Sequence, residues 1–352
     1  MAIAATEEVR KNYSAAMGLA VRTLFVKSDG ESMTGDAKSR TPIYIGTRNF
    51  LGRRDLVVSF YTTKCQFQCT YCALPLRSAV HEVPASDLNL QIDRVFDDYS
   101  DRLGEFRQFS FGNEGSALDQ KRFHIASLHH LLTRVKGMGA LEVLSIETRP
   151  EYVKRERLED IRTRTSASII DLTVGFETQD DYIRQTVLRK STPRKVMESR
   201  VALLGDLGMR LTSYVLIRPA PRMTEEHGVR EAIATMEYLG ELCARHGVEL
   251  VIYLTPTYIA EGSHLQQTTQ PGDWMPPTIQ SIFEVVVAGH RMGLPVYIGL
   301  WSEDLADERT DFRGREGYDP DLRTALVRFN RTSDFRHLEP FLGMPRLSGW
   351  AS

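Results

Sequence analysis

Hydrophobic positions follow two different spacings along the chain from residue 55 onward. Short runs of β-branched and aromatic residues, typical of strands, alternate with longer stretches in which apolar residues recur every three or four positions, typical of amphipathic helices. The predicted strands cover 56–61, 106–111, 141–147, 169–176, 211–217 and 250–255. The predicted helices include 119–136, 193–207 and 224–246, and glycines within 137–139, 205–209 and 246–248 mark helix ends.

The repeated order of strand and helix predicts an α/β fold in which parallel strands are joined by right-handed crossovers. An open doubly wound sheet and a full or partial barrel both fit this order, and in both architectures ligands bind at the C-terminal ends of the strands. The pattern also divides the chain into three parts. These are an N-terminal extension over 1–50 with a polar loop at 27–40, the α/β domain over 51–300, and a charged C-terminal cap or extension over 301–352.

The composition is that of an ordinary soluble protein. Of the 352 residues, 42% are hydrophobic and 26% are charged. No stretch approaches the ~20 apolar residues of a membrane-spanning helix, and the N-terminus lacks the apolar segment of a signal peptide. We therefore expect a cytoplasmic protein that does not bind membranes.

The formal net charge of −2 disfavours a nucleic-acid partner. Proteins dedicated to nucleic acids usually carry a basic excess, because phosphate contacts dominate their affinity. The densest basic stretches, 53–55 and 153–165, are interspersed with acidic residues and indicate a solvated face.

Three of the four cysteines lie within eight residues, as Cys65-x3-Cys69-x2-Cys72 directly after the first predicted strand. Three thiolates on one tight loop can bind three irons of a cubane cluster and leave the fourth iron open to a small chelating molecule. A zinc site is the alternative, but structural zinc normally takes four ligands, no second CxxC exists, and neither His81 nor His124 has a suggestive spacing. The remaining cysteine, Cys243, is expected to be a buried small apolar residue.

This cysteine motif, with the aromatic Tyr71 just before Cys72, is similar to that of the radical S-adenosylmethionine (SAM) superfamily. The resemblance implies a 4Fe–4S cluster on the three cysteines and SAM as a second cofactor. In that family the cluster cleaves SAM reductively to methionine and a 5′-deoxyadenosyl radical, which takes a hydrogen atom from the substrate. The family fold implies a partial (β/α)6 TIM-like barrel with N- and C-terminal extensions.

The segment FGNEGS follows the second predicted strand, where the family carries its GGE-type motif for the methionine amine. The resemblance makes Glu114 the acceptor for that amine, with Gly112, Asn113 and Ser116 nearby. A cationic amine needs carboxylate or carbonyl acceptors, and glycine permits a close approach of the backbone. The alternative is an ordinary strand-to-helix turn with Ser116 or Asp119 as the N-cap.

Two further motifs follow the third and fourth predicted strands. IETRPEYV and VGFET resemble segments of the subgroup that includes the Elongator catalytic subunit and the archaeosine-synthase radical SAM subunit. The resemblance implies that Arg149 pairs with the SAM carboxylate and that Glu147 accepts from the amine or the ribose. Glu177 is a candidate for binding the ribose hydroxyls or a polar group of the substrate. The alternatives are a surface Glu–Arg pair and, after the fourth strand, a helix N-cap at Thr178 or Asp180.

The fifth and sixth predicted strands also resemble those of the subgroup, and there Arg218, Tyr253 and Thr255 are candidates for lining the pocket. The resemblance covers residues 53–265. No residue is singled out as catalytic, and nothing in the sequence selects a tyrosine or cysteine as a second hydrogen donor.

Three hypotheses about function remain. The first is a radical SAM enzyme acting on a small molecule such as an amino acid, sugar or nucleoside, with flavodoxin or ferredoxin as the electron donor implied by the family. The second is a tRNA-modifying radical SAM enzyme, which the balanced charge and the absence of a basic RNA-binding module disfavour. The third is a non-catalytic metal-binding scaffold, which does not explain why polar motifs follow three successive strands.

Overall fold

All six predicted strands form in the computed structural model, which describes residues 36–270, 272–301, 306 and 309–344. They belong to one eight-stranded sheet in which the strands lie side by side in chain order. β1 is antiparallel to β2, and every later neighbour is parallel. The strands are β1 Tyr44–Phe50, β2 Arg53–Phe60, β3 Gln108–Asn113, β4 Val143–Thr148, β5 Ile169–Glu177, β6 Arg210–Ile217, β7 Leu250–Pro256 and β8 Val296–Ile298.

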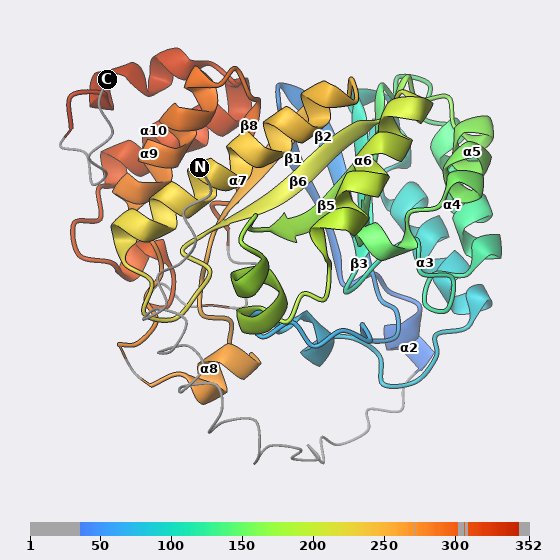
Figure 1. Cartoon of the computed structure of the whole chain (residues 1–352). Helices are drawn as coiled ribbons and strands as arrows, with labels where there is room; N and C mark the ends of the chain where they lie inside the picture. Colours follow the sequence, from blue (N-terminus) through green and yellow to red (C-terminus); the bar gives the residue numbers. More distant parts are fainter. Residues whose placement is uncertain (1–35, 271, 302–305, 307–308, 345–352) are drawn as a thin grey trace.

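The α-helices are α2 Asp36–Ser39, α3 Ala85–Asp98, α4 Ile125–Lys136, α5 Arg155–Arg164, α6 Arg194–Leu207, α7 Glu225–Arg245, α8 His264–Thr268, α9 Ile279–Arg291 and α10 Pro320–Thr332. Helices α3 to α7, α9 and α10 lie on the outer side of the curved sheet, whereas α2 and α8 lie near the ends of the strands (Figure 1). Short 3-10 segments lie at Leu74–Leu76, Ser100–Glu105, Pro150–Tyr152, Phe312–Gly314, Phe335–His337 and Glu339–Phe341, and a π-helical turn at Ile183–Val187.

Two strands of the sheet, β1 and β8, were not predicted. β1 pairs with β2 along its whole length, so part of the segment assigned to the N-terminal extension is a strand of the sheet. Three residues of β1 are exposed, Gly46 interrupts the pattern and only Phe50 is buried, which hides the alternation, and β8 has only three residues. The predicted helical start and most of the polar loop fall within 1–35, and parts of the C-terminal segment fall at 302–305, 307–308 and 345–352, all outside the described residues.

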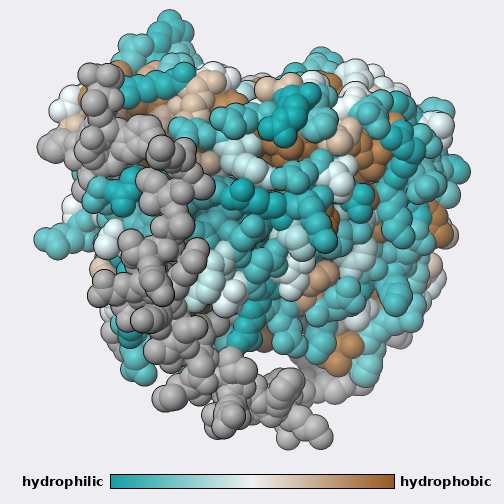
Figure 2. Space-filling view, in the orientation of Figure 1, coloured by the Kyte–Doolittle hydropathy of each residue, from teal (hydrophilic) through white to brown (hydrophobic). Residues whose placement is uncertain are grey.

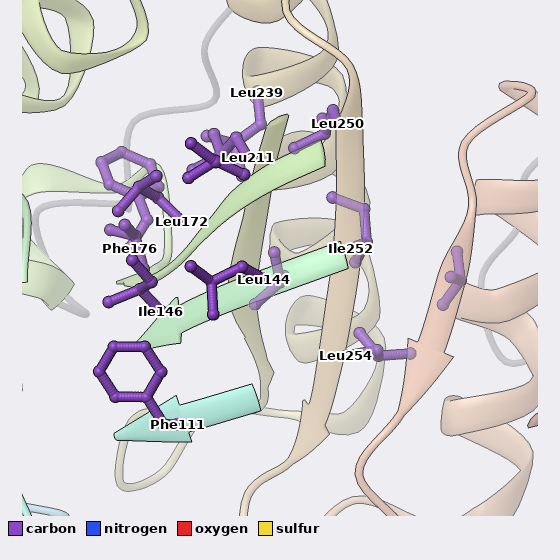
Figure 3. Packing of buried hydrophobic residues seen from close by; sticks show 14 of the residues in the cluster. Phe111, Leu144, Ile146, Leu172, Phe176, Leu211, Leu239, Leu250, Ile252 and Leu254 are labelled. Atoms are coloured by element: carbon purple, nitrogen blue, oxygen red, sulfur yellow. The ribbon is translucent and has the colours of Figure 1, made fainter. Parts of the chain in front are cut away.

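Alternation along the strands separates an apolar outer face from a polar inner face. On β5, Leu172, Val174 and Phe176 point outward into the core, whereas Asp171 and Thr173 point into the space that the sheet encloses. Both sets are buried, because helices cover one face and the curvature of the sheet covers the other. Figure 3 shows side chains of this outer core, contributed by β3 to β7 and by α7.

The inner face carries a buried polar network. The carboxylate of Asp171 accepts from Arg210 Nε at 2.7 Å, from Ser145 Oγ at 2.8 Å and from Thr212 Oγ1 at 2.8 Å. These groups lie on β4, β5 and β6, so the network joins three neighbouring strands from inside. Arg210 and Asp171 are almost completely buried, which makes each the necessary partner of the other.

Side chains close the seam where β1 and β8 approach each other. Within the described residues the backbone ladder runs from β1 to β8 and does not continue back to β1. Phe50 of β1 contacts Tyr297 of β8 with ring centroids 4.6 Å apart, and Tyr44 contacts Trp301 at 5.2 Å. Helix α10 packs against both strands from outside.

The outer helices end and begin largely as the pattern predicts. Gly208 takes the left-handed conformation (φ 59°) after α6, and the Thr224 side chain accepts from His227 N at the start of α7. Helix α4 begins at Ile125 rather than near 119, because Asp119 forms a separate turn whose carbonyl accepts from Phe123 N. The face in Figure 2 is mainly hydrophilic. None of the described helices combines the length and apolar character that crossing a membrane requires.

Gly205 marks a close contact between α6 and the turn after α7. A Cβ at this position would lie 2.3 Å from the main-chain oxygen of His246. We expect Gly205→Ala to lower the free energy of unfolding by about 1–3 kcal/mol, since a backbone oxygen cannot swing aside and the clash outweighs the better helix propensity of alanine. Urea unfolding measures the change.

Gly240→Ala is the matched control for Gly205→Ala. Gly240 lies within α7, and the nearest atom to a new Cβ is 3.9 Å away, on Leu294. This variant is expected to raise the free energy of unfolding by up to about 1 kcal/mol, because alanine favours the helix. Stabilisation by both substitutions would contradict the packing argument.

Candidate active site

The loop that carries the three cysteines follows β2 and is tied at its base. Ala79 N donates to Thr62 O and Lys64 N donates to Ala79 O, both at 3.0 Å. Further along the loop, Thr70 N donates to Leu188 O at 3.0 Å and Thr70 O accepts from Leu265 N at 2.8 Å. These bonds hold the cysteine loop between the turn after β5 and α8, at the C-terminal edge of the parallel strands.

Cys65, Cys69 and Cys72 line one pocket of about 180 Å³, and each is partly accessible. Burial and the neighbouring Cys69 raise the pKa of the Cys72 thiol. Within the described residues, no three His, Cys, Asp or Glu side chains converge closely enough to hold a single metal ion. Three cysteines on one loop are a donor set that fits a cluster, in which each thiolate binds a different iron. His81 and His124 are not part of the pocket lining.

Two cations lie beside Cys69. Arg149 Nη1 lies 3.7 Å from Cys69 Sγ, and its guanidinium stacks over the Phe67 ring at 3.5 Å. Arg149 also donates to Glu151 and to the main-chain oxygen of Lys190. Burial disfavours the charged guanidinium, but Glu151 and Cys69 outweigh it and raise the pKa of Arg149. The guanidinium therefore stays charged next to the cysteines.

Lys190 is the second cation, and nothing in the sequence pattern identifies it. The residue is buried in the turn after β5, between Arg189 and Ser191, which both take positive φ. Its Nζ donates to Glu177 Oε1 at 2.7 Å. Burial opposes its charge, but Glu177 and Cys69 raise the pKa of Lys190. Its position depends on the tertiary fold of this turn rather than on a local motif.

Tyr71 and Glu177 complete this side of the pocket. The Tyr71 hydroxyl donates to Glu177 Oε1 at 2.8 Å, and Lys190 Nζ lies 3.3 Å from the same hydroxyl. Burial and the Glu177 carboxylate raise the pKa of Tyr71 well above its usual value. The N-cap alternative also holds after β5, where Asp180 Oδ1 accepts from Ile183 N at 2.9 Å.

The residues after β3 form the opposite side of the pocket. Glu114 is buried and accepts from Arg77 Nη2 at 3.2 Å and from Ser59 Oγ at 3.4 Å. Gly115 lies against Cys65, where a Cβ would meet the Cys65 Cβ at 3.2 Å. Glycine is thus needed here for the strand end to approach the cysteine loop. Arg77 is a neighbour of Glu114 that the sequence did not identify.

Ser116, Gly112 and Asn113 have different surroundings. The Ser116 hydroxyl lies 2.7 Å from Thr148 Oγ1 and accepts from Arg149 N at 3.4 Å, so it joins the end of β3 to the end of β4. It does not cap α4. Gly112 lies against Glu147, because a Cβ added at Gly112 would lie 3.0 Å from the Cβ of Glu147. Strand alternation places the Asn113 side chain on the face of Phe111, away from Glu114's partners.

Glu147 lies between this pocket and a second cavity. Its Oε2 accepts from the Tyr214 hydroxyl at 3.3 Å. The second cavity, of about 370 Å³, lies inside the curve of the sheet, and we call it the lumen. Glu114, Glu147, Tyr214 and Tyr253 line both spaces, so the lumen and the cysteine pocket adjoin. Thr255 lines the cysteine pocket, as predicted from the late strands.

Arg218 does not reach this site. Its guanidinium donates to Glu225 Oε2 at 2.6 Å and to Met223 O at 2.7 Å, which fastens the start of α7. Gly228 of α7 lies against the Cβ of Arg218, so Arg218 packs closely on the start of α7. Of the predicted residues, the cysteine pocket is lined by Tyr71, Glu114, Glu147, Arg149 and Glu177. Gly112 and Asn113 line the lumen instead, whereas Ser116 and Arg218 line neither space.

Comparison with known sequences finds distant relatives, and no family model matches the chain. An uncharacterized protein of Methanocaldococcus jannaschii is 22% identical over 246 residues, 68% of this chain and 65% of that protein. Archaeosine synthase subunit beta of Methanosarcina acetivorans is 19% identical over 242 residues, 68% of this chain and 67% of that protein. The chain thus spans about two thirds of the length of the curated relatives it matches.

Comparison with solved structures shows the fold. A point mutant of spore photoproduct lyase matches with a TM-score of 0.52 and 13% identity, covering 83% of this chain and 94% of that one. A radical SAM methyltransferase from Sphaerobacter thermophilus matches with a TM-score of 0.49 and 13% identity, covering 72% of this chain and 67% of that one. The curved, mostly parallel sheet and its likeness to the lyase show a partial TIM-like α/β barrel, which confirms the predicted fold class.

Proposed function

We propose that the chain is a radical SAM enzyme that acts on a small-molecule substrate. In this proposal Cys65, Cys69 and Cys72 hold a 4Fe–4S cluster. When bound, such a cluster supplies the electron that cleaves SAM to methionine and a 5′-deoxyadenosyl radical. The observation that carries the proposal is that the three cysteines share one pocket with Glu114, Glu177, Arg149 and Lys190, at the strand ends and beside the lumen.

The polar residues of the pocket suit the two ends of an amino acid. Glu114 offers a buried carboxylate to an ammonium group, and Arg149 and Lys190 offer positive charge to a carboxylate. Glu177 and Tyr71 are placed to bind hydroxyls, and Glu147 lies at the boundary with the lumen. Because these side chains are held by hydrogen bonds to one another, they would orient SAM without rearrangement.

The test is anaerobic reconstitution with iron and sulfide. The expected result is about four irons per protein, an EPR signal of the reduced cluster that changes when SAM is added, and formation of methionine and 5′-deoxyadenosine. Zinc in place of iron, or a cluster whose EPR signal ignores SAM, would contradict the proposal. Flavodoxin or ferredoxin is proposed as the electron donor, and a chemical reductant replaces it in this assay.

Glu114→Ala is expected to weaken SAM binding by about tenfold or more and to leave the iron content unchanged. The loss follows from removing a charged acceptor for an ammonium group. Equilibrium dialysis with labelled SAM and iron analysis measure the two effects. Glu105→Ala, which removes an exposed surface carboxylate, is the control and is expected to change neither. Loss of iron on Glu114→Ala would instead assign Glu114 a structural role.

A tRNA substrate is the second candidate, favoured by the relatives named archaeosine synthase subunit beta. The near-neutral net charge disfavours it. A gel-shift titration with tRNA at several salt concentrations decides between the candidates. Tight binding that weakens steeply with salt would favour tRNA, whereas weak binding at moderate salt is expected for a small-molecule enzyme.

A further inference from the structure

The lumen has two chemically different walls. One wall carries tyrosines in a single row, since Tyr214, Tyr253 and Tyr297 face one another in register across β6, β7 and β8. Their ring centroids are 4.7 Å and 5.1 Å apart and the ring planes are tilted by 53° and 58°, so the row presents aromatic rings one after another to the lumen. The opposite wall carries small side chains on β2 to β5, among them Ser59, Ser110 and Thr173. The tyrosine rings are therefore gathered on one wall of the lumen, and the hydroxyl groups of these small residues lie on the other.

Arg48 of β1 packs against the aromatic wall and holds its rings in place. Its guanidinium lies over the rings of Phe50, Tyr297 and Tyr253 at 4.7, 5.3 and 5.6 Å from the centroids. Arg48 Nε also donates to the buried Asp55 at 2.8 Å. These contacts hold the tyrosine rings in place without a ligand, so a flat ligand would find a preorganised surface.

The small-residue wall presents hydrogen-bond acceptors. Ser110 Oγ donates to Asp55 at 2.9 Å, and Ser145 Oγ donates to Asp171 at 2.8 Å. Ser110 Oγ also accepts from Gln108 Nε2 at 3.0 Å, and Ser145 Oγ lies 2.9 Å from Thr173 Oγ1. Each hydroxyl oxygen thus keeps one lone pair that can accept from a ligand.

The carboxylates of Glu114 and Glu147, at the end of the lumen that adjoins the cysteine pocket, are acceptors as well. Arg48 and Arg77 also line the lumen, where Arg48 pairs with Asp55 and Arg77 pairs with Glu114. Because these charges are paired within the protein, the lumen favours a neutral ligand.

From this arrangement we propose that the lumen binds a neutral, flat heteroaromatic ring that carries NH or OH donors, with its face on the tyrosine row and its donors toward the serine and glutamate side. A volume of about 370 Å³ suits a ligand of the size of a nucleoside. The proposal deepens the proposed function, because the ring is taken to be the substrate, held where the lumen adjoins the cysteine pocket.

The test compares three probes on reconstituted protein saturated with SAM, so that the cysteine pocket is occupied. Guanosine has both the flat ring and the donors, tryptophol has the ring with few donors, and ribose has the donors without the ring. Calorimetry or equilibrium dialysis gives the affinities, which are expected to fall in that order. Ribose binding as tightly as guanosine, or no binding of guanosine, would overturn the proposal.

Two variants locate the binding. Tyr297 lines the lumen and not the cysteine pocket, so Tyr297→Leu is expected to weaken guanosine binding by about fivefold or more through loss of stacking. Val57→Phe fills the lumen from the opposite wall, without removing a side-chain hydrogen bond, and is expected to abolish binding. Thermal unfolding of each variant confirms that it folds.

The control is Tyr238→Leu, which removes a tyrosine from α7, where the ring stacks on Phe176 outside the lumen. It is expected to leave guanosine affinity unchanged, and equal losses in Tyr297→Leu and Tyr238→Leu would overturn the proposal. Reductive cleavage of SAM by the wild-type protein is measured separately. Cleavage without guanosine binding contradicts the lumen proposal alone, whereas failure of cleavage contradicts the proposed function.

Discussion

Cys69→Ala is expected to abolish reductive SAM cleavage, reducing 5′-deoxyadenosine formation to the background of cluster-free protein. The cysteine loop supplies three thiolates to the pocket, and a cubane held by two of them loses both an iron ligand and the geometry that leaves one iron open. The measurements are iron and sulfide content, the EPR spectrum of the reduced protein, and product formation under anaerobic conditions.

Cys243→Ala is the matched control for this experiment. Cys243 is buried on α7, far from the loop along the chain, and burial raises the pKa of its thiol. The substitution removes one sulfur from the core and is expected to leave cluster content and SAM cleavage unchanged. Persistence of cleavage in Cys69→Ala would contradict the cluster assignment. Loss of cleavage in Cys243→Ala would show that the assay reports general destabilisation.

Asp171→Ala is expected to lower the free energy of unfolding by about 3–5 kcal/mol, the largest effect on stability that we predict. The substitution leaves the buried guanidinium of Arg210 without its carboxylate and removes the acceptor of Ser145 and Thr212. Urea unfolding followed by circular dichroism measures the loss. Replacing both Asp171 and Arg210 by alanine is expected to cost less than the sum of the single changes, because the two charges are coupled.

Asp206→Ala provides the comparison on the surface. Asp206 pairs with Arg155 at 2.6 Å, but both side chains are about half exposed, so their removal is expected to change stability by less than about 1 kcal/mol. A similar loss in Asp171→Ala and Asp206→Ala would contradict the view that the inner polar network holds the central strands together.

The sequence predicts those features of the fold that are encoded locally. The six central strands were predicted because their outer faces form continuous apolar sets and glycines end the preceding helices. β1 was missed because only Phe50 is buried and the other residues are exposed or half-buried, so the contrast between its two faces is weak. The place of β1 in the sheet is set by its pairing with β2, and the sequence pattern of residues 44–50 does not predict this pairing.

The same distinction applies to the site. Cys65, Cys69 and Cys72 could be predicted because one short loop carries them all, and Glu114 and Glu177 because each follows a strand. Lys190 and Arg48 could not, since each reaches its partners only through the turn or strand that the tertiary structure places there. Arg218 follows a strand too, but its contacts with Glu225 and Met223 turn it toward α7.

The seam between β1 and β8 determines how the enclosure can adapt. A ladder of backbone hydrogen bonds keeps its spacing until several bonds break together, whereas the contact between the exposed rings of Tyr44 and Trp301 can shift without breaking a backbone hydrogen bond. The width of the lumen can thus change through small rotamer changes at the seam, while the parallel strands keep their register. Ligands of somewhat different size should therefore fit in the lumen while the sheet stays intact. In related chains, the residues that change with ligand specificity are expected to lie along this seam.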